Sequence, residues 1–331
     1  MPEKATAATE AASKFRDEFG RLVDEVSKVI VGYRDIIDSV LTCLLCDGHA
    51  LLEGVPGVGK TLLVNTLARC LELEFSRIQF TPDLMPADVT GTTMILDDEK
   101  TGGRCQQFVR GPIFGNIILA DEINRATPKT QSALLEAMQE RHVTVSRVTH
   151  VLAEPFMVLA TQNPLEMEGT YPLPEAQMDR FLFKIHFPFP SGREIAEILE
   201  RTTTTQAPQA SRIMGGEQVL AMRRVVREVP VASHVQEYAI RMVLATHPEL
   251  PDAPEITRNY VRYGSSPRGA QALLLGGKVR ALLDGRFALA REDIDAVCHL
   301  ALRHRLVLNF EGEAANLTPD AVLDEIRHKI R

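Results

Sequence analysis

The 331-residue sequence lacks several features that would assign it to whole classes of protein. Its cysteines number five, an odd count that argues against a disulfide-linked secreted fold and favours a reducing, cytoplasmic location. No apolar run approaches the roughly 20 residues that a membrane-spanning helix needs, and the N-terminus has no apolar signal-peptide core. Basic residues do not dominate either, because 37 Lys and Arg stand against 44 Asp and Glu. The net charge of -7 argues against a protein that coats nucleic acid or an anionic membrane.

What is present fits an ordinary globular protein of two domains, with 45% hydrophobic and 24% charged residues. Short apolar runs alternate with helical patterns as far as residue 187, which is typical of a parallel α/β sheet. The runs expected to form strands are 50–53, 75–80, 116–120, 156–161 and 181–187. Prolines and a glycine then end the last strand, and only helical patterns follow. We predict a disordered tail at 1–14, an α/β core at 15–187 and a helical domain at 188–331.

The strongest local signal is the segment GVPGVGKT at 54–61, which fits the pattern G-x-x-x-x-G-K-[ST]. A buried strand is expected before it and a helix after it, as a phosphate-binding loop requires. Glycines let successive backbone N–H groups point at a phosphate, and the helix N-terminus adds a favourable dipole. Lys60 can then reach the β- and γ-phosphates, while the Thr61 hydroxyl can bind Mg²⁺.

Polar residues also follow two other expected strands. Asp121 and Glu122 end the strand at 116–120, where Asp121 would lie beside the loop and bind Mg²⁺, directly or through water. Side chains alternate along a strand, so Glu122 would point differently and could activate a water molecule. Asn163 ends the next strand and could orient that water, although an ordinary Asn-Pro turn explains its pattern equally well. The base-reading signals of GTPases are missing, which favours ATP.

In order and spacing, these and other segments resemble the MoxR family of AAA+ ATPases, in the branch with an insert in helix 2. The most specific segments are IVG at 30–32, GHALLEGVPG at 48–57, QFTPDLMP at 79–86, LADEINRA at 119–126, ATQNP at 160–164, LPEAQMDRF at 173–181 and SPRGA at 266–270. The resemblance implies an αβα sandwich with a five-stranded parallel sheet, followed by a small all-helical lid domain.

The resemblance also implies a role for each site residue. Those that would contact the nucleotide are Val31, Gly32, Gly54, Val55, Pro56, Gly57, Val58, Gly59, Lys60, Thr61, Leu62 and Arg268. Asp121 and Glu122 are similar to the Walker B pair and Asn163 to sensor 1. Arg180 is similar to the arginine finger that reaches the ATP of a neighbouring subunit, with Arg125 as its rival. Arg268 is similar to sensor 2, which contacts the γ-phosphate within its own subunit.

Two segments, 92–109 and 143–151, are expected as hairpins and are similar to the inserts of this family. The function implied is an ATP- and Mg²⁺-dependent ring, usually of six copies, that remodels or matures client protein complexes. The resemblance further implies partners with von Willebrand factor A domains and work on metal or cofactor insertion.

Two other functions stay open. A nucleic-acid motor is opposed by the acidic balance and by the absence of an appended helix-turn-helix or zinc module. A switch that binds nucleotide with little hydrolysis is opposed by Glu122, which such a switch does not need.

Overall fold

The structure is a computed structural model that describes residues 2–97, 104–164, 169–203 and 208–330. Its centre is a five-stranded sheet in the order β2-β5-β8-β1-β9, in which all neighbouring strands run parallel. The strands are β1 (Ala50–Glu53), β2 (Phe75–Gln79), β5 (Ile117–Asp121), β8 (Met157–Gln162) and β9 (Phe183–His186). The prediction of a five-stranded parallel sheet is confirmed.

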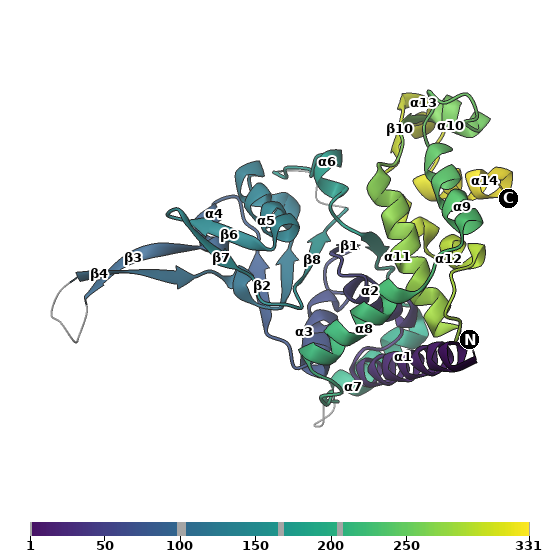
Figure 1. The fold of residues 1–331 in the computed structure, drawn as a ribbon. Coiled ribbons are helices and arrows are strands. Elements are labelled where there is room, and N and C mark those ends of the chain that lie inside the picture. The colour runs from purple at the N-terminus through teal and green to yellow at the C-terminus, as the bar shows by residue number, and fades with distance from the viewer. Residues whose placement is uncertain (1, 98–103, 165–168, 204–207, 331) are drawn as a thin grey trace.

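Helices cover both faces of this sheet (Figure 1). Because side chains alternate along a strand, Ile117 and Leu119 of β5 enter one apolar core, while Ile118 and Ala120 enter another. The first core includes residues of α2 (Arg34–Leu45) and α3 (Lys60–Cys70), and the second includes residues of α5 (Pro128–Glu140). The αβα sandwich is therefore also confirmed. Short helices α4 (Pro86–Thr90) and α6 (Glu175–Met178) complete this part of the chain.

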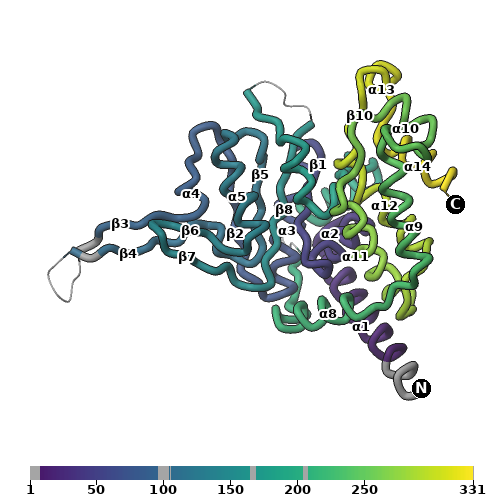
Figure 2. The backbone as a smooth tube through the Cα atoms, turned by 45° about the horizontal axis from the view of Figure 1, so that its top comes forward, coloured from purple at the N-terminus to yellow at the C-terminus, as the bar shows by residue number. Residues whose placement is uncertain are grey.

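The N-terminal segment corrects one prediction. Helix α1 spans Pro2–Val29, so the expected disordered tail at 1–14 is wrong from residue 2 onward. Ala12 is completely buried, and Phe15 and Phe19 continue the same apolar face. The sequence hid this helix because its first turns are rich in alanine, which favours helix but adds little apolar pattern. In space α1 contacts α2 and α3 of the core as well as the lid helix α11 (Pro267–Leu283) (Figures 1 and 2).

Both predicted hairpins are present. Strands β3 (Gly91–Asp97) and β4 (Arg104–Arg110) pair antiparallel, as do β6 (His142–Val145) and β7 (Val148–Val151). The turn expected at 102–103 lies outside the described residues. In Figure 1 the β3–β4 hairpin projects away from the sheet, on the side opposite the lid. The two hairpins meet where the ring of Phe108 stacks on that of His150, with centroids 3.9 Å apart.

After β9 the chain is mostly helical, as predicted. The helices are α7 (Gly192–Thr202), α8 (Gly216–Glu228), α9 (Ser233–Leu244), α10 (Glu255–Tyr260), α11, α12 (Arg291–Leu302), α13 (Phe310–Ala314) and α14 (Pro319–Ile330). The prediction of helices alone misses a small antiparallel sheet of β10 (Val261–Tyr263) and β11 (Val307–Leu308). These strands are too short to carry an apolar alternation, and they pair residues more than 40 positions apart.

Two further observations concern the described residues as a whole. None of their helices is long and apolar enough to cross a membrane, and no three of their His, Cys, Asp or Glu side chains form a cluster that could hold a metal ion. Cys43 and Cys46, whose spacing is that of a metal-binding pair, are buried free thiols. Burial raises the pKa of the Cys46 thiol to about 12, so this thiol stays protonated at neutral pH and packs as a small apolar side chain.

Candidate active site

The phosphate-binding loop joins the end of β1 to the start of α3. Gly57 and Gly59 have φ values of +83° and +90°, a left-handed backbone that favours glycine. Lys60 is the first residue of α3, and its side chain is only 9% exposed. Its Nζ donates to the carbonyl oxygen of Gly54 at 2.7 Å, so the ammonium lies within the curve of the loop. Burial lowers the pKa of Lys60, although nearby carboxylates oppose the shift.

A cleft of about 420 Å³ lies beside this loop, and polar residues at the ends of the strands line it. It is lined by Pro56, Gly57, Gly59, Lys60, Thr61, Leu62, Arg77, Gln79, Asp121, Glu122, Thr161 and Asn163. The structure therefore brings together the predicted lysine, hydroxyl, acidic pair and asparagine. They converge because the carboxyl ends of parallel strands meet at one edge of the sheet.

Asp121 is held from two sides. The Arg77 guanidinium donates to its Oδ2 from Nη2 at 2.7 Å and from Nε at 3.1 Å. The hydroxyl of Thr161 donates to its Oδ1 at 2.7 Å. That hydroxyl also accepts from the backbone N–H of Glu122 at 2.8 Å, which fixes the turn after β5.

Glu122 follows the last residue of β5 and has a left-handed backbone with a φ of 55°, so the alternation of the strand does not extend to it. Its Oε2 accepts from Gln79 Nε2 and from Arg125 Nη1, each at 2.8 Å. Arg125, the predicted rival for the arginine finger, thus contacts the acid of its own protomer. Asn163 is buried and lines the same cleft.

A smaller apolar pocket of about 220 Å³ adjoins the cleft and shares Gly57, Gly59 and Leu62 with it. Val31 lines this pocket, in the region predicted for adenine, together with Tyr33, Phe187 and Ile198 of α7. Neighbouring Gly32 has a φ of 65°, and a Cβ there would collide with Glu194 of α7. A planar, apolar ring would fit between these side chains.

Below the loop, Glu53 at the end of β1 anchors the neighbouring strand. It pairs with Lys184 at 2.7 Å and with His186 at 2.8 Å, both on β9. Burial opposes ionisation, but these two partners outweigh it and lower the Glu53 pKa to about 2. The charged form is therefore strongly favoured.

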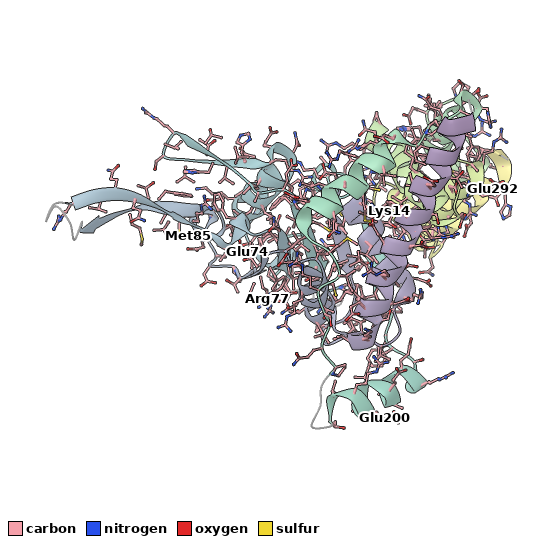
Figure 3. All side chains as sticks on the ribbon, turned by 60° about the horizontal axis from the view of Figure 1, so that its bottom comes forward. Lys14, Glu74, Arg77, Met85, Glu200 and Glu292 are labelled. Atoms are coloured by element: carbon pink, nitrogen blue, oxygen red, sulfur yellow. The ribbon has the colours of Figure 1, made fainter. Side chains whose placement is uncertain are left out.

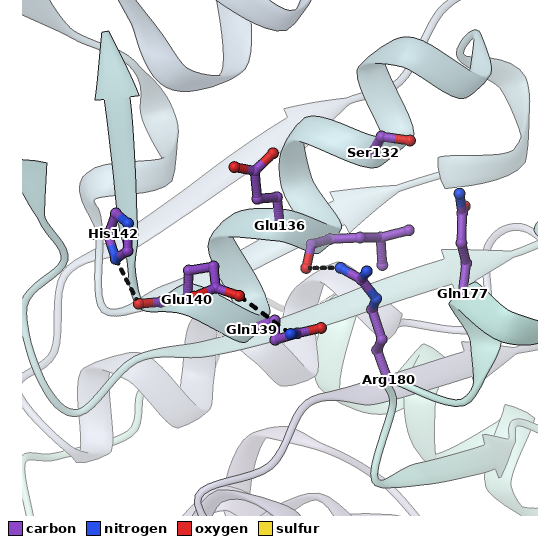
Figure 4. A pocket seen from close by; sticks show the side chains of 8 residues that line it. Ser132, Glu136, Gln139, Glu140, His142, Gln177 and Arg180 are labelled. Atoms are coloured by element: carbon purple, nitrogen blue, oxygen red, sulfur yellow. Dashed lines mark hydrogen bonds between the residues drawn. The ribbon is translucent and has the colours of Figure 1, made fainter. Parts of the chain in front are cut away.

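Arg180 lies elsewhere, in a second pocket that shares no residue with the cleft (Figure 4). This pocket is lined by Ser132, Leu135, Glu136, Gln139, Glu140, His142, Gln177 and Arg180. The Arg180 Nη1 donates to the carbonyl oxygen of Leu135 at 2.8 Å, with the half-buried guanidinium beside α5.

Arg268, which was predicted to contact a phosphate within its own subunit, is not among the residues that line the cleft. Its Nη1 lies 3.9 Å from Asp179 Oδ2, and its Nη2 lies 3.5 Å from Gln139 Oε1. Gln139 also lines the Arg180 pocket, so Arg180 and Arg268 lie on one side of the protomer. We call this side the arginine face.

Arg305 fixes the arginine face to the lid. Its side chain is 2% exposed, and its Nε donates to Asp179 Oδ1 at 2.8 Å. It also donates to the carbonyl oxygens of Asp179 and Phe181, at 3.0 and 2.8 Å. The Ser266 hydroxyl, which caps α11, donates to the same carboxylate. Asp179 therefore connects the segment carrying Arg180 with the lid helix carrying Arg268.

Several of these residues escaped the sequence analysis. Gln79 is the first residue of the quoted segment 79–86, yet its side chain was given no role. Arg77 lies just before that segment and belongs to no motif; a basic residue two positions before the polar end of a strand was the available signal. Thr161 lies within the quoted segment 160–164, yet its hydroxyl was given no role. Arg305 has no local signal, because its partner Asp179 is 126 positions away.

Known protein families match both the core and the lid of this chain. Residues 49–183 match the ATPase family associated with various cellular activities (AAA), and residues 253–326 match the AAA lid domain. Chaperone MoxR1 of Mycobacterium tuberculosis is 42% identical over 92% of this chain and 80% of its own length. The chain belongs to the MoxR family of AAA+ ATPases.

Two other similar proteins extend over nearly the whole chain. The uncharacterised protein YeaC of Bacillus subtilis is 42% identical over 94% of both chains. The crystal structure of a protein from Cytophaga hutchinsonii, named only as a candidate ATPase, superposes with a TM-score of 0.91. It is 40% identical and covers 99% of this chain and 98% of its own. The architecture of core and lid is thus shared along the full length of this MoxR-family chain.

Proposed function

We propose that this protein hydrolyses ATP at the interface between two copies of itself and uses the cycle to remodel client proteins. The observation that carries the proposal is the separation of two sets of residues in one protomer. Lys60, Thr61, Asp121, Glu122 and Asn163 line the cleft, whereas Arg180 and Arg268 lie on the arginine face.

In the cleft, Lys60 and the backbone N–H groups at the start of α3 would hold the β- and γ-phosphates. A carboxylate and a hydroxyl are ligands that Mg²⁺ prefers, so Asp121 and Thr61 fit that ion. The bound ion would supply positive charge beside the phosphates. Because Gln79 and Arg125 both donate to Glu122 Oε2, its Oε1 is the oxygen that would accept a proton from the attacking water.

The arginine face would serve the cleft of the next copy. Phosphoryl transfer accumulates charge on the γ-phosphoryl oxygens, and a guanidinium that reaches them stabilises the transition state. A head-to-tail contact between two different faces forms a ring when the rotation between neighbours closes after a whole number of copies. The family resemblance suggests six copies. The position of Arg268 beside Asp179 and Gln139 supports a role for it, together with Arg180, in serving the neighbour.

Remodelling of clients is supported by the name of the mycobacterial relative, a chaperone, and by the two hairpins. Met94, Ile95, Val148 and Val151 are exposed on these hairpins, Val151 to 77%. Exposed apolar side chains on projecting strands suit contact with another protein. Partners with von Willebrand factor A domains, and a role in metal or cofactor insertion, are part of the proposal on the resemblance alone.

The test combines turnover with client capture. Wild-type protein should release phosphate from ATP in the presence of Mg²⁺, with a specific activity that rises as protein concentration drives assembly. Glu122→Gln should bind ATP but lose roughly a hundredfold in turnover, since it cannot take the proton. With ATP, this variant should co-purify with a defined protein that wild-type protein releases. Full turnover by Glu122→Gln, or turnover that depends on added nucleic acid instead, would contradict the proposal.

A further inference from the structure

Arg77 forms an ion pair with the carboxylate of Asp121, to which the proposed mechanism assigns Mg²⁺. Two of its nitrogens donate to Asp121 Oδ2, at 2.7 and 3.1 Å, and Nη2 also donates to Gln79 Oε1 at 2.6 Å. The other oxygen, Oδ1, accepts from the Thr161 hydroxyl. Both carboxylate oxygens of Asp121 are therefore engaged by donors of the protein itself.

The sheet explains how Arg77 reaches this carboxylate. In the parallel pair of β2 and β5, Arg77 is in register with Leu119 and Gln79 with Asp121. Residues two apart on a strand share a face, so Arg77, Gln79 and Asp121 project from the same face. Strand β2 is at the edge of the sheet, and the Arg77 side chain is 48% exposed (Figure 3). The guanidinium can therefore swing into solvent without disturbing the core.

We propose that Arg77 competes with the divalent metal ion for Asp121: it pairs with the carboxylate in the metal-free protein and leaves when the metal–nucleotide complex enters. This inference rests on the proposed function, since it takes Asp121 as a metal ligand. A guanidinium and a divalent cation repel one another and need the same lone pairs, so both cannot hold Oδ2 at short range. An ion pair with a half-exposed arginine is weak, which makes the exchange easy.

Competition predicts that removing the Arg77 charge strengthens metal binding. Mn²⁺ serves as the probe, and its free concentration is measured by electron paramagnetic resonance in the presence of a slowly hydrolysed ATP analogue. In Arg77→Gln the Mn²⁺ concentration that half-saturates the protein–nucleotide complex should fall about threefold to fivefold below the wild-type value. An unchanged or higher concentration overturns the inference, because Arg77 would then be neutral toward the metal or assist it.

Arg77→Lys provides a second variant that keeps the charge. Lysine offers a point charge rather than a planar fork, so it should compete less well and lower the half-saturating concentration about twofold. No decrease in this variant also overturns the inference, even where Arg77→Gln does not fold. Arg212→Gln is the matched control, because Arg212 pairs with Glu72 at 2.5 Å outside the cleft. It should leave the Mn²⁺ titration at the wild-type value.

The same titration separates this inference from the proposed function. Wild-type protein that binds neither nucleotide nor Mn²⁺ would contradict both. Wild-type protein that binds both, with an identical titration for Arg77→Gln, contradicts only the competition at Asp121.

Discussion

The nucleotide cleft and the arginine face differ in what holds their cationic side chains. In the cleft, Arg77 and Arg125 contact the two acids that the mechanism uses, and Lys60 contacts the loop itself. On the arginine face, Arg180 contacts a backbone carbonyl, while Arg268 approaches Asp179, a residue anchored by the lid. In the cleft, arginine side chains are thus held by the two acids. On the arginine face, the arginines are held by a backbone carbonyl and by contacts at the junction of core and lid. This difference suggests that the cleft binds the phosphates, whereas the arginine face supplies cations to the cleft of the next copy.

The largest expected effect comes from removing the guanidinium of the arginine face. Arg180→Ala should lower ATP turnover about a thousandfold, because the charge on the transferred group loses its stabilising partner. Affinity for a fluorescent ATP analogue should stay at the wild-type value, since Arg180 is not in the cleft of its own protomer. Arg180→Lys is the matched variant and should recover part of the activity. Full activity of Arg180→Ala would assign the arginine finger elsewhere, with Arg125 next to be tested.

Arg268→Ala should have a smaller effect of the same kind. We expect a loss of about a hundredfold in turnover, typical of one removed donor to a transition state, with little change in nucleotide affinity. Turnover and affinity are measured side by side on the assembled protein. A large loss of affinity instead would indicate that Arg268 serves its own cleft, as the sequence comparison first implied.

Replacing Arg305 tests the junction of core and lid, where Arg305 pairs with Asp179. Truncating this buried cation removes the charge that pairs most closely with Asp179 and leaves that carboxylate the Ser266 hydroxyl and the more distant Arg268. Arg305→Ala should therefore lower the free energy of unfolding by about 3–5 kcal/mol. Urea denaturation followed by circular dichroism gives the value. Arg212→Ala, in an exposed pair, is the control and should cost no more than about 1 kcal/mol. Equal effects in the two variants would show that the junction does not depend on the Arg305–Asp179 pair.

The smallest expected effect is the loss of stability on replacing Glu53, at the end of β1, and this loss depends on pH. A carboxyl group with a lowered pKa stabilises the fold above its ordinary pKa of 4.5, and this contribution disappears as the pH falls toward about 2. Glu53→Gln should therefore cost about 2 kcal/mol at pH 7. The difference from wild type should narrow between pH 5 and pH 3, measured by urea denaturation at each pH. A difference in stability that stays constant across that range would show that the charge of Glu53 is not the stabilising feature. Glu228→Gln, at an exposed position, is the control.

The sequence predicted the parts of the molecule that follow from local chemistry. Asp121 ends one buried strand and Asn163 directly follows another, and the two converge because the parallel order brings the carboxyl ends of these strands together. Contacts over long sequence separations were not predictable. Arg77 resembles an ordinary surface arginine until β2 is placed beside β5, and Arg305 needs the lid docked against Asp179. The position of Arg268 near Asp179 depends on that same docking, so its contacts could not be predicted from the local sequence.

Mixing two inactive variants tests the central claim most directly. Glu122→Gln keeps an intact arginine face, and Arg180→Ala keeps an intact cleft. If each active site is shared between neighbours, random mixing should restore about a quarter of the wild-type sites, those in which the Arg180→Ala cleft meets the Glu122→Gln arginine face. The account predicts ATP turnover well above that of either variant alone. Turnover that stays at the level of the separate variants, in mixed oligomers shown to contain both, would contradict it.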